Sequence, residues 1–231
     1  MGLWRPRRAA WWIAVLFAAG STMFLIPGLA ALGSSADWIA VTFFCGSICF
    51  TTASLVQLVM AFEVPHRARP RAERHLRPRS WLPARVDWVS AAVQFPGTVL
   101  FNVNTYAALN TQLTTRQADV RVWAPDLIGS AFFLVSSVVA FAGAEKSSLS
   151  WRPRDLDWWI TGLNLVGSIA FGVSAVAAFI RPETGSAVSD RIANGGTAAG
   201  ALCFLIAAVL LMPEAERRAV RQRVAAAADS A

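Results

Sequence analysis

Six stretches of this chain are apolar over roughly 20 residues or more, and this pattern constrains the fold more than any other feature. A bilayer core about 30 Å thick is crossed by an α-helix of that length. The stretches occupy residues 10–32, 37–62, 86–109, 122–144, 157–180 and 190–212. Continuous apolar runs favour helices, because the strands of membrane barrels are short and alternate polar with apolar residues. The sequence therefore predicts an all-α bundle of six transmembrane helices.

The short length of the connectors predicts a single integral membrane domain over residues 1–231. Hydrophobic residues make up 55% of the chain, and no connector contains an apolar run that could bury a core of its own. The first stretch follows Arg5, Arg7 and Arg8, as in a signal peptide. It is longer than the apolar region of such a peptide, which spans roughly 7–15 residues. We therefore expect it to remain as a membrane helix.

Basic residues alternate between rich and poor connectors, and this alternation predicts the orientation. With both termini in the cytoplasm, 17 of the 21 Lys and Arg residues lie on the cytoplasmic side and four on the other. The positive-inside rule then places the N and C termini in the cytoplasm. Arginine far outnumbers lysine and alanine is abundant, which is typical of GC-rich coding. We therefore expect a bacterial plasma membrane.

A glycine followed four residues later by a phenylalanine occurs in each of the six predicted spans. The glycines are Gly20, Gly46, Gly97, Gly129, Gly167 and Gly200. Residues four apart share a helix face, so each phenylalanine stands one turn beyond a glycine. In lipid, helices associate through small residues that permit close backbone approach, and through hydroxyl hydrogen bonds. We expect these glycines to be helix-packing sites near the bilayer centre, in preference to lining a pore.

The same motif indicates internal repetition. Across the three predicted outer connectors the glycines are 26, 32 and 33 residues apart, a spacing compatible with three tandem helical hairpins. The segments DWIAVTFFCGSICF at 37–50 and WWITGLNLVGSIAF at 158–171 resemble the small two-helix YrhK-like membrane domain. The resemblance covers the spans and not the connectors. It implies helical hairpins and supplies no activity or site residues.

The connector between the second and third spans is rich in arginine and proline, and two interpretations of it remain open. It could act only as an orientation signal, or it could contact anionic lipid headgroups, which attract each nearby basic residue by about 1 kcal/mol. Nucleic-acid binding is not expected, because Trp81 is the only aromatic residue there that could stack on bases. The candidate lipid contacts are Arg67, Arg69, Arg71, Arg74, Arg77 and Arg79.

Residues typical of catalytic or metal sites are sparse. His66 and His75 lack a third ligand, so they do not predict a metal site. Cys45 and Cys49 fall within a span, where we expect them to be buried as small apolar side chains. No Ser/His/Asp set, phosphate-binding loop or metalloprotease motif occurs. We expect no enzymatic activity, cofactor or metal ion.

Polar residues inside the spans point to function, because their cost in lipid must be offset by partners or by water. They divide into two layers: Gln57, Gln94 and Asn164 toward the cytoplasm, and Asn102, Asn104, Tyr106 and Asp126 toward the outside. Asn102 and Tyr106 share a helix face, and Asp126 lies at a similar depth. We therefore expect Asn102, Tyr106 and Asp126 to form a cluster. The alternative for Asp126 is a first-turn aspartate near water.

These features predict a multi-pass membrane protein with a structural or interaction role. The partners considered are the lipid bilayer and a second copy of the chain in a homo-oligomer. The alternative is a small transporter or channel with a path past the two polar layers. Pro96-Gly97 is the one helix break near the centre of a span, as such a path would need. A sealed apolar waist would favour the first role, and a water-filled path would favour the second.

Overall fold

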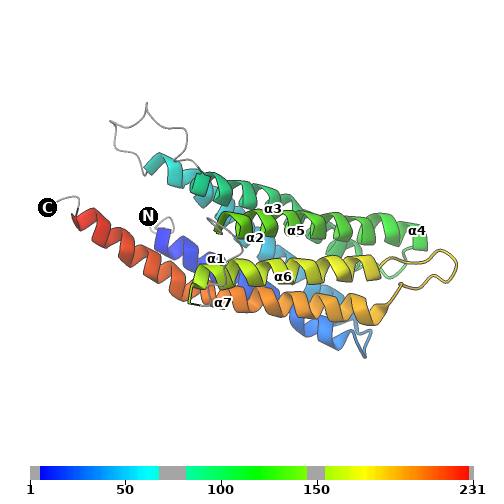
Figure 1. The fold of residues 1–231 in the computed structure, drawn as a ribbon. Coiled ribbons are helices and arrows are strands. Elements are labelled where there is room, and N and C mark those ends of the chain that lie inside the picture. The colour runs from blue at the N-terminus through cyan, green and yellow to red at the C-terminus, as the bar shows by residue number, and fades with distance from the viewer. Residues whose placement is uncertain (1–5, 68–81, 145–153, 229–231) are drawn as a thin grey trace.

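A computed structural model of the chain describes residues 6–67, 82–144 and 154–228, which fold almost entirely into helices (Figure 1). The elements are α1 (Pro6–Ala30), α2 (Asp37–Arg67), α3 (Leu82–Ala107), α4 (Thr115–Ala118), the π-helical turn η2 (Asp119–Trp123), α5 (Ala124–Ala144), α6 (Leu156–Ala177) and α7 (Asp190–Ala228). Within the described residues, β pairing is limited to an isolated bridge between Ile180 and Ala187. The predicted all-α bundle is confirmed.

Five helical segments of the described chain are long and apolar enough to cross a membrane. They are Ala9–Ala30, Asp37–Phe62, Thr115–Gly143, Leu156–Ala177 and Asp190–Pro213. The sixth long helix, α3, has 26 residues but carries Gln94, Asn102 and Asn104. It packs between α2 and α5 in the same bundle. The one long helix that is not among these five spans is therefore held between two helices that are.

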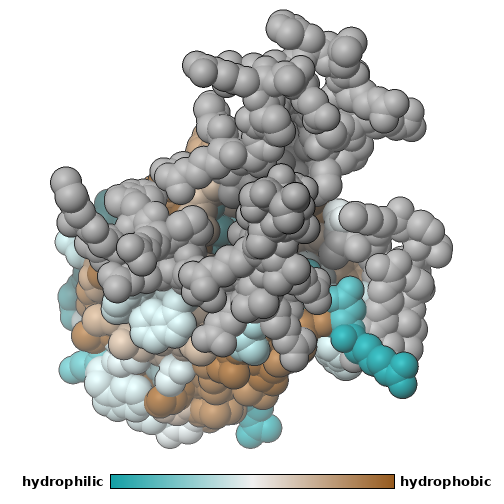
Figure 2. Space-filling model, turned by 90° about the vertical axis from the view of Figure 1, so that its left-hand side faces the viewer, coloured by the Kyte–Doolittle hydropathy of each residue, from teal (hydrophilic) through white to brown (hydrophobic). Residues whose placement is uncertain are grey.

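The six long helices form a closed ring in the order α1, α2, α3, α5, α6 and α7, and α7 returns to contact α1. Consecutive helices are antiparallel, so the connections 31–36, 108–114 and 178–189 lie together at one end of the bundle, the loop end (Figure 1). The opposite end, where α1 begins, is the termini end. Figure 2 views the bundle from the termini end and shows hydrophobic side chains on its flank, as lipid-facing helices require.

The centre of the ring is filled by six phenylalanines, one from each long helix: Phe24, Phe50, Phe101, Phe133, Phe171 and Phe204. None is more than 7% exposed. The rings of Phe24, Phe101 and Phe171 form one triangle, with centroids 5.9 to 6.4 Å apart. Those of Phe50, Phe133 and Phe204 form a second, with centroids 5.9 to 6.3 Å apart. These six rings, here called the phenylalanine plug, pack at distances favourable for aromatic contacts.

The glycines of the repeated motif meet in pairs within the three hairpins α1–α2, α3–α5 and α6–α7. A Cβ on Gly20 would lie 3.1 Å from the carbonyl oxygen of Gly46. A Cβ on Gly97 would lie 3.0 Å from the oxygen of Gly129, and the Gly167–Gly200 pair repeats this distance. Each phenylalanine ring lies against the glycine of its partner helix, because no side chain occupies that space. The plug and the glycine pairs together make the waist of the bundle.

The predicted span at 122–144 begins earlier than expected, at Thr115. Thr114 and Gln117 form a capping box, in which the Gln117 N–H donates to Thr114 Oγ1 and the Thr114 N–H donates to Gln117 Oε1. The helix then widens into η2 before Pro125. A proline lacks an N–H and clashes with the carbonyl four residues earlier, and a π-turn just before it relieves that clash. The widened turn sets the direction of the residues that follow it.

Candidate binding pocket at the loop end

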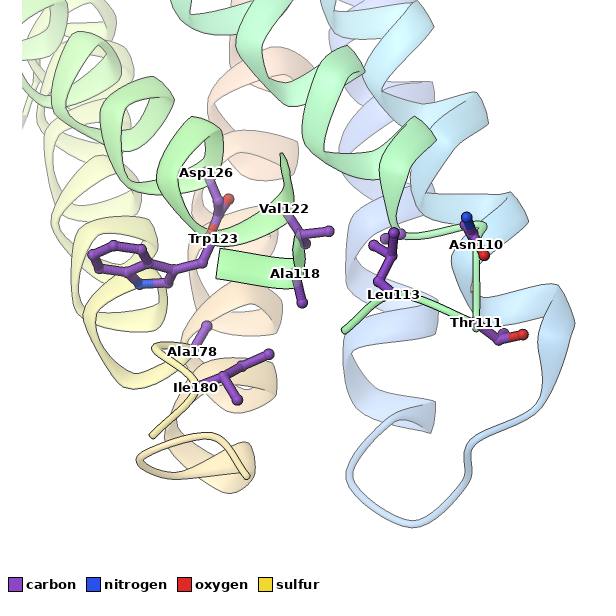
Figure 3. A pocket seen from close by; sticks show the side chains of 10 residues that line it. Asn110, Thr111, Leu113, Ala118, Val122, Trp123, Asp126, Ala178 and Ile180 are labelled. Atoms are coloured by element: carbon purple, nitrogen blue, oxygen red, sulfur yellow. The ribbon is translucent and has the colours of Figure 1, made fainter. Parts of the chain in front are cut away.

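A cavity of about 270 Å³ lies at the loop end of the bundle, and Figure 3 shows the side chains that line it. It is lined by Ala108, Asn110, Thr111, Leu113, Ala118, Val122, Trp123, Asp126, Ala178 and Ile180. These residues come from the α3–α4 connection, from the continuous α4–η2–α5 segment and from the start of the α6–α7 connection. Asp126 is the only charged residue among them. The pocket is thus an apolar hollow with one carboxyl group in its wall.

Asp126 lies on the first turn of α5 and is tied to α3 by one hydrogen bond. Asn104 Nδ2 donates to Asp126 Oδ1 over 2.9 Å. The Asn104 side chain is buried, at 5% exposure, whereas Asp126 is partly exposed toward the cavity. Within the described part of the chain, this is the one hydrogen bond that the Asp126 side chain makes. An ionised carboxylate can accept several more, so Asp126 retains capacity for a further donor.

Trp123 fixes the wall of the pocket against α6. Its Nε1–H donates to the carbonyl oxygen of Ala175 over 3.0 Å, and its ring packs edge-on against Phe179 at a centroid distance of 4.8 Å. In Figure 3 the ring points away from Leu113, toward α6. Trp123 ends the π-turn, which commonly occurs at functional sites. The turn therefore orients Trp123 toward α6 and leaves Asp126 beside the cavity.

The predicted cluster of Asn102, Tyr106 and Asp126 does not form. Asn102 Nδ2 donates to Thr51 Oγ1 of α2 over 2.9 Å. Tyr106 is 67% exposed and packs its ring against Phe44, also of α2. Residues two apart on a helix point to nearly opposite sides, so the α3 face that carries Asn102 and Tyr106 turns toward α2.

Asn104, and not Asn102, is the α3 residue that contacts Asp126. The spacing of Asn104 from the glycine motif could have predicted this. Asn104 lies seven residues after Gly97 and three after Phe101, which puts all three on the face toward the bundle axis. Asp126 similarly lies three residues before Gly129. The glycine motif therefore identifies the inward faces of α3 and α5, and the residues one turn further along those faces meet at the pocket.

Equivalent positions in the other two hairpins are not charged. In α6–α7 they are Ser174 and Thr197, whose hydroxyl oxygens lie 2.7 Å apart in a hydrogen bond. In α1–α2 they are Pro27 and Phe43. The three hairpins thus carry a carboxylate–amide pair, a hydroxyl pair and an apolar pair in the same register.

The phenylalanine plug separates the pocket from the polar side chains nearer the termini end. On that side, Ser90 and Ser136 join α3 to α5 through hydroxyls 2.9 Å apart. Ser137 and Ser168 join α5 to α6 in the same way, at 2.8 Å. Between the six rings of the plug the remaining cavity is about 10 Å³. The two predicted polar layers are therefore not joined along the axis.

The remaining candidate residues fall outside the pocket. Arg67 is the last residue of α2, whereas Arg69, Arg71, Arg74, Arg77 and Arg79 lie outside the described residues. Cys45 is exposed, in contrast to the expected burial, because its side of α2 faces outward. No group of three His, Cys, Asp or Glu residues that could hold a metal ion occurs in residues 6–67, 82–144 and 154–228.

Comparisons with family models, with curated proteins and with solved structures find no match to this chain.

Proposed function

We propose that this protein is a non-conducting multi-pass membrane protein with a structural or interaction role, and not a channel or an enzyme. The observation that carries the proposal is the phenylalanine plug, which leaves about 10 Å³ between its rings. That volume is roughly the minimum needed to hold one water molecule. A dry apolar constriction opposes the passage of ions, because an ion that enters it loses its hydration shell.

We further propose that both termini lie in the cytoplasm of a bacterial plasma membrane. The support is the charge asymmetry, with 17 basic residues on the assigned cytoplasmic side and four on the other. A reporter active only in the cytoplasm should work when fused after Ala231 and fail when inserted within residues 112–120. Activity at 112–120 and none after Ala231 would reverse the orientation.

The repeated hairpins support a role in which the bundle acts as a rigid unit. Each hairpin closes on a glycine pair, and the rings of all three interlock at the axis. Such interlocking favours a fixed scaffold over an element that opens. It also agrees with three tandem units of the kind that the YrhK-like resemblance implies.

The pocket favours a second candidate, a small transporter whose substrate enters from the loop end. The specific observation is Asp126, a carboxyl group at the wall of a cavity within a membrane-spanning segment. Transport would require the six rings of the plug to separate. The two candidates therefore differ in one measurable property, which is passage of solute through the waist.

Flux measurements on purified protein in liposomes test the proposal. Proton flux is followed with an entrapped pH dye, and potassium flux under an imposed gradient, with protein-free vesicles and gramicidin-containing vesicles as the two controls. We expect rates equal to those of protein-free vesicles. Flux that rises in proportion to the protein-to-lipid ratio would contradict the non-conducting role and support the transporter.

A further inference from the structure

We propose that the loop-end pocket binds a small ammonium ion with an apolar body, whose charged group contacts the Asp126 carboxylate. This inference goes beyond the proposed structural role and holds whether or not the plug ever opens. It rests on three features: an available carboxylate, a comparison among the three hairpins, and the chemistry of the cavity wall.

The carboxylate is placed to accept a donor from the cavity. Its Oδ1 accepts from Asn104 Nδ2, and no Lys or Arg is among the residues that line the pocket. Among the described residues, Asp126 forms no salt bridge. A charged group at this depth needs compensation. A cation that enters the pocket from the loop end would supply it.

The comparison among hairpins argues that the charge is not needed to hold the helices together. Ser174 and Thr197 tie α6 to α7 in the same register with a neutral hydrogen bond. In α1–α2 the register is filled by Pro27 and Phe43, with no polar pair at all. Burying a neutral pair costs less than burying a carboxylate. Asp126 therefore carries a cost that helix packing alone does not explain.

The cavity wall selects the kind of cation. Most of its residues are apolar, and they would surround an aliphatic body: Ala108, Leu113, Ala118, Val122, Ala178 and Ile180. A bare divalent ion would need about six oxygen ligands, and one carboxylate with Asn110 and Thr111 supplies too few. An anion would be repelled by Asp126. A volume of about 270 Å³ suits a small amine.

Such an ammonium group could come from a free amine in the surrounding water or from the headgroup of phosphatidylethanolamine. Both present the same primary ammonium, and the pocket opens at the loop end, where either source is available. The proposal concerns the primary ammonium group that both sources share. A competition experiment between the two sources shows which of them the pocket binds.

Calorimetric titration of the full chain in dodecyl maltoside, a neutral detergent, tests the proposal with isobutylammonium as the probe. Isobutanol, which has the same body without the charge, is the matched neutral probe. We expect isobutylammonium to bind about tenfold or more tightly than isobutanol, because both probes can donate a hydrogen bond to the Asp126 carboxylate but only the ammonium adds the attraction between opposite charges. Equal affinity for the two probes would overturn the proposal.

Two variants and a control locate the site. Asp126→Asn keeps the oxygen that accepts from Asn104, so it should fold normally and lose about tenfold or more of the isobutylammonium affinity. Ala118→Leu projects a larger side chain into the cavity while leaving the carboxylate in place, and should weaken binding as well. Asp190→Asn, at the exposed start of α7, should leave binding unchanged. Unchanged binding in either pocket variant would overturn the proposal.

Short-chain phosphatidylethanolamine, titrated against bound isobutylammonium with short-chain phosphatidylglycerol as control, identifies the source. Displacement of isobutylammonium by phosphatidylethanolamine alone assigns the pocket to a lipid headgroup. Binding of isobutylammonium without displacement assigns it to a free amine. Displacement by both lipids alike would show that the probe is not held through its ammonium group and would overturn the proposal.

Discussion

The waist and the loop end of the bundle differ in how far the three hairpins agree. At the waist every hairpin presents a glycine pair and two phenylalanines, so the three copies are nearly interchangeable. One turn toward the loop end the copies diverge into an apolar pair, a hydroxyl pair and the Asn104–Asp126 pair. The glycines and phenylalanines that all three hairpins share serve helix packing. The charged pair, which only α3–α5 has, is the better candidate for a specific function.

The hairpin α3–α5 diverges on the other side of the waist as well. The hydroxyl oxygens of Ser90 and Ser136 lie 2.9 Å apart, and each also lies within hydrogen-bond distance of the carbonyl oxygen of the other residue. The equivalent residues of α6–α7 are Ile160 and Ala207, both buried and apolar. The middle hairpin is therefore polar on both sides of a waist that it shares with its neighbours. Ser90 and Asn104, which lie on the two sides of the waist, both belong to α3 and add to its polar content.

The largest expected effect is on the shared waist. Phe101→Ala removes a ring that contacts Phe24, Phe133 and Phe171. Truncation of a buried phenylalanine costs about 3–5 kcal/mol, because the cavity cannot be filled by the remaining rings. Phe62→Ala, at a ring that is 52% exposed, is the control and should cost far less. Equal free energies of unfolding for the two variants in detergent would show that the plug does not hold the bundle together.

The next effect concerns the glycine pairs. Gly46→Leu and Gly167→Leu place side chains where a Cβ would already lie 3.0 Å or less from a phenylalanine ring of the partner helix. Overpacking of this kind costs about 1–3 kcal/mol. Gly172 lies on the same helix as Gly167, but a Cβ at this position would have no neighbouring atom within 4 Å. Gly172→Leu therefore serves as the control. Similar thermal stability of the three variants in detergent would show that the glycines are not contact points.

The smallest effect on stability is expected where the hairpins diverge. The double variant Asn104→Ser/Asp126→Thr transplants the pair found in α6–α7 into α3–α5. Because a neutral pair serves that register in α6–α7, unfolding should change by no more than about 1 kcal/mol. Isobutylammonium binding should be lost at the same time. A strong loss of stability, measured by denaturant unfolding, would mean that the Asn104–Asp126 pair is mainly a structural tie.

The waist could be predicted from the sequence because its signal is local and repeated. A glycine and a phenylalanine four residues apart must share a helix face, whatever surrounds the helix. The existence of the six helices follows from their apolar length in the same way. The structure adds that the glycine–phenylalanine faces of all six helices converge on one axis. That convergence depends on the order of the helices around the bundle, which the sequence does not give.

The pocket could be predicted only in part, because spacing alone does not say which face of a helix points inward. Asn102 and Tyr106 share a face, as expected, but that face turns toward α2. Asn104 would have been chosen by extending the inward face from Gly97 through Phe101. The roles of Trp123 and of the π-turn depend on the packing of α5 against α6, which no local pattern encodes.

The accessibility of a cysteine at the waist tests the closed bundle most directly. In a background with Cys45, Cys49 and Cys203 replaced by alanine, Ser130→Cys places a thiol of nearly the same size at a position that is 1% exposed beside Gly129. Ala108→Cys places one in the wall of the pocket. A membrane-impermeant thiosulfonate reagent, applied to both sides of the membrane, should label residue 108 and leave residue 130 unmodified. Labelling at comparable rates would mean that water reaches the waist, and the closed bundle would be wrong.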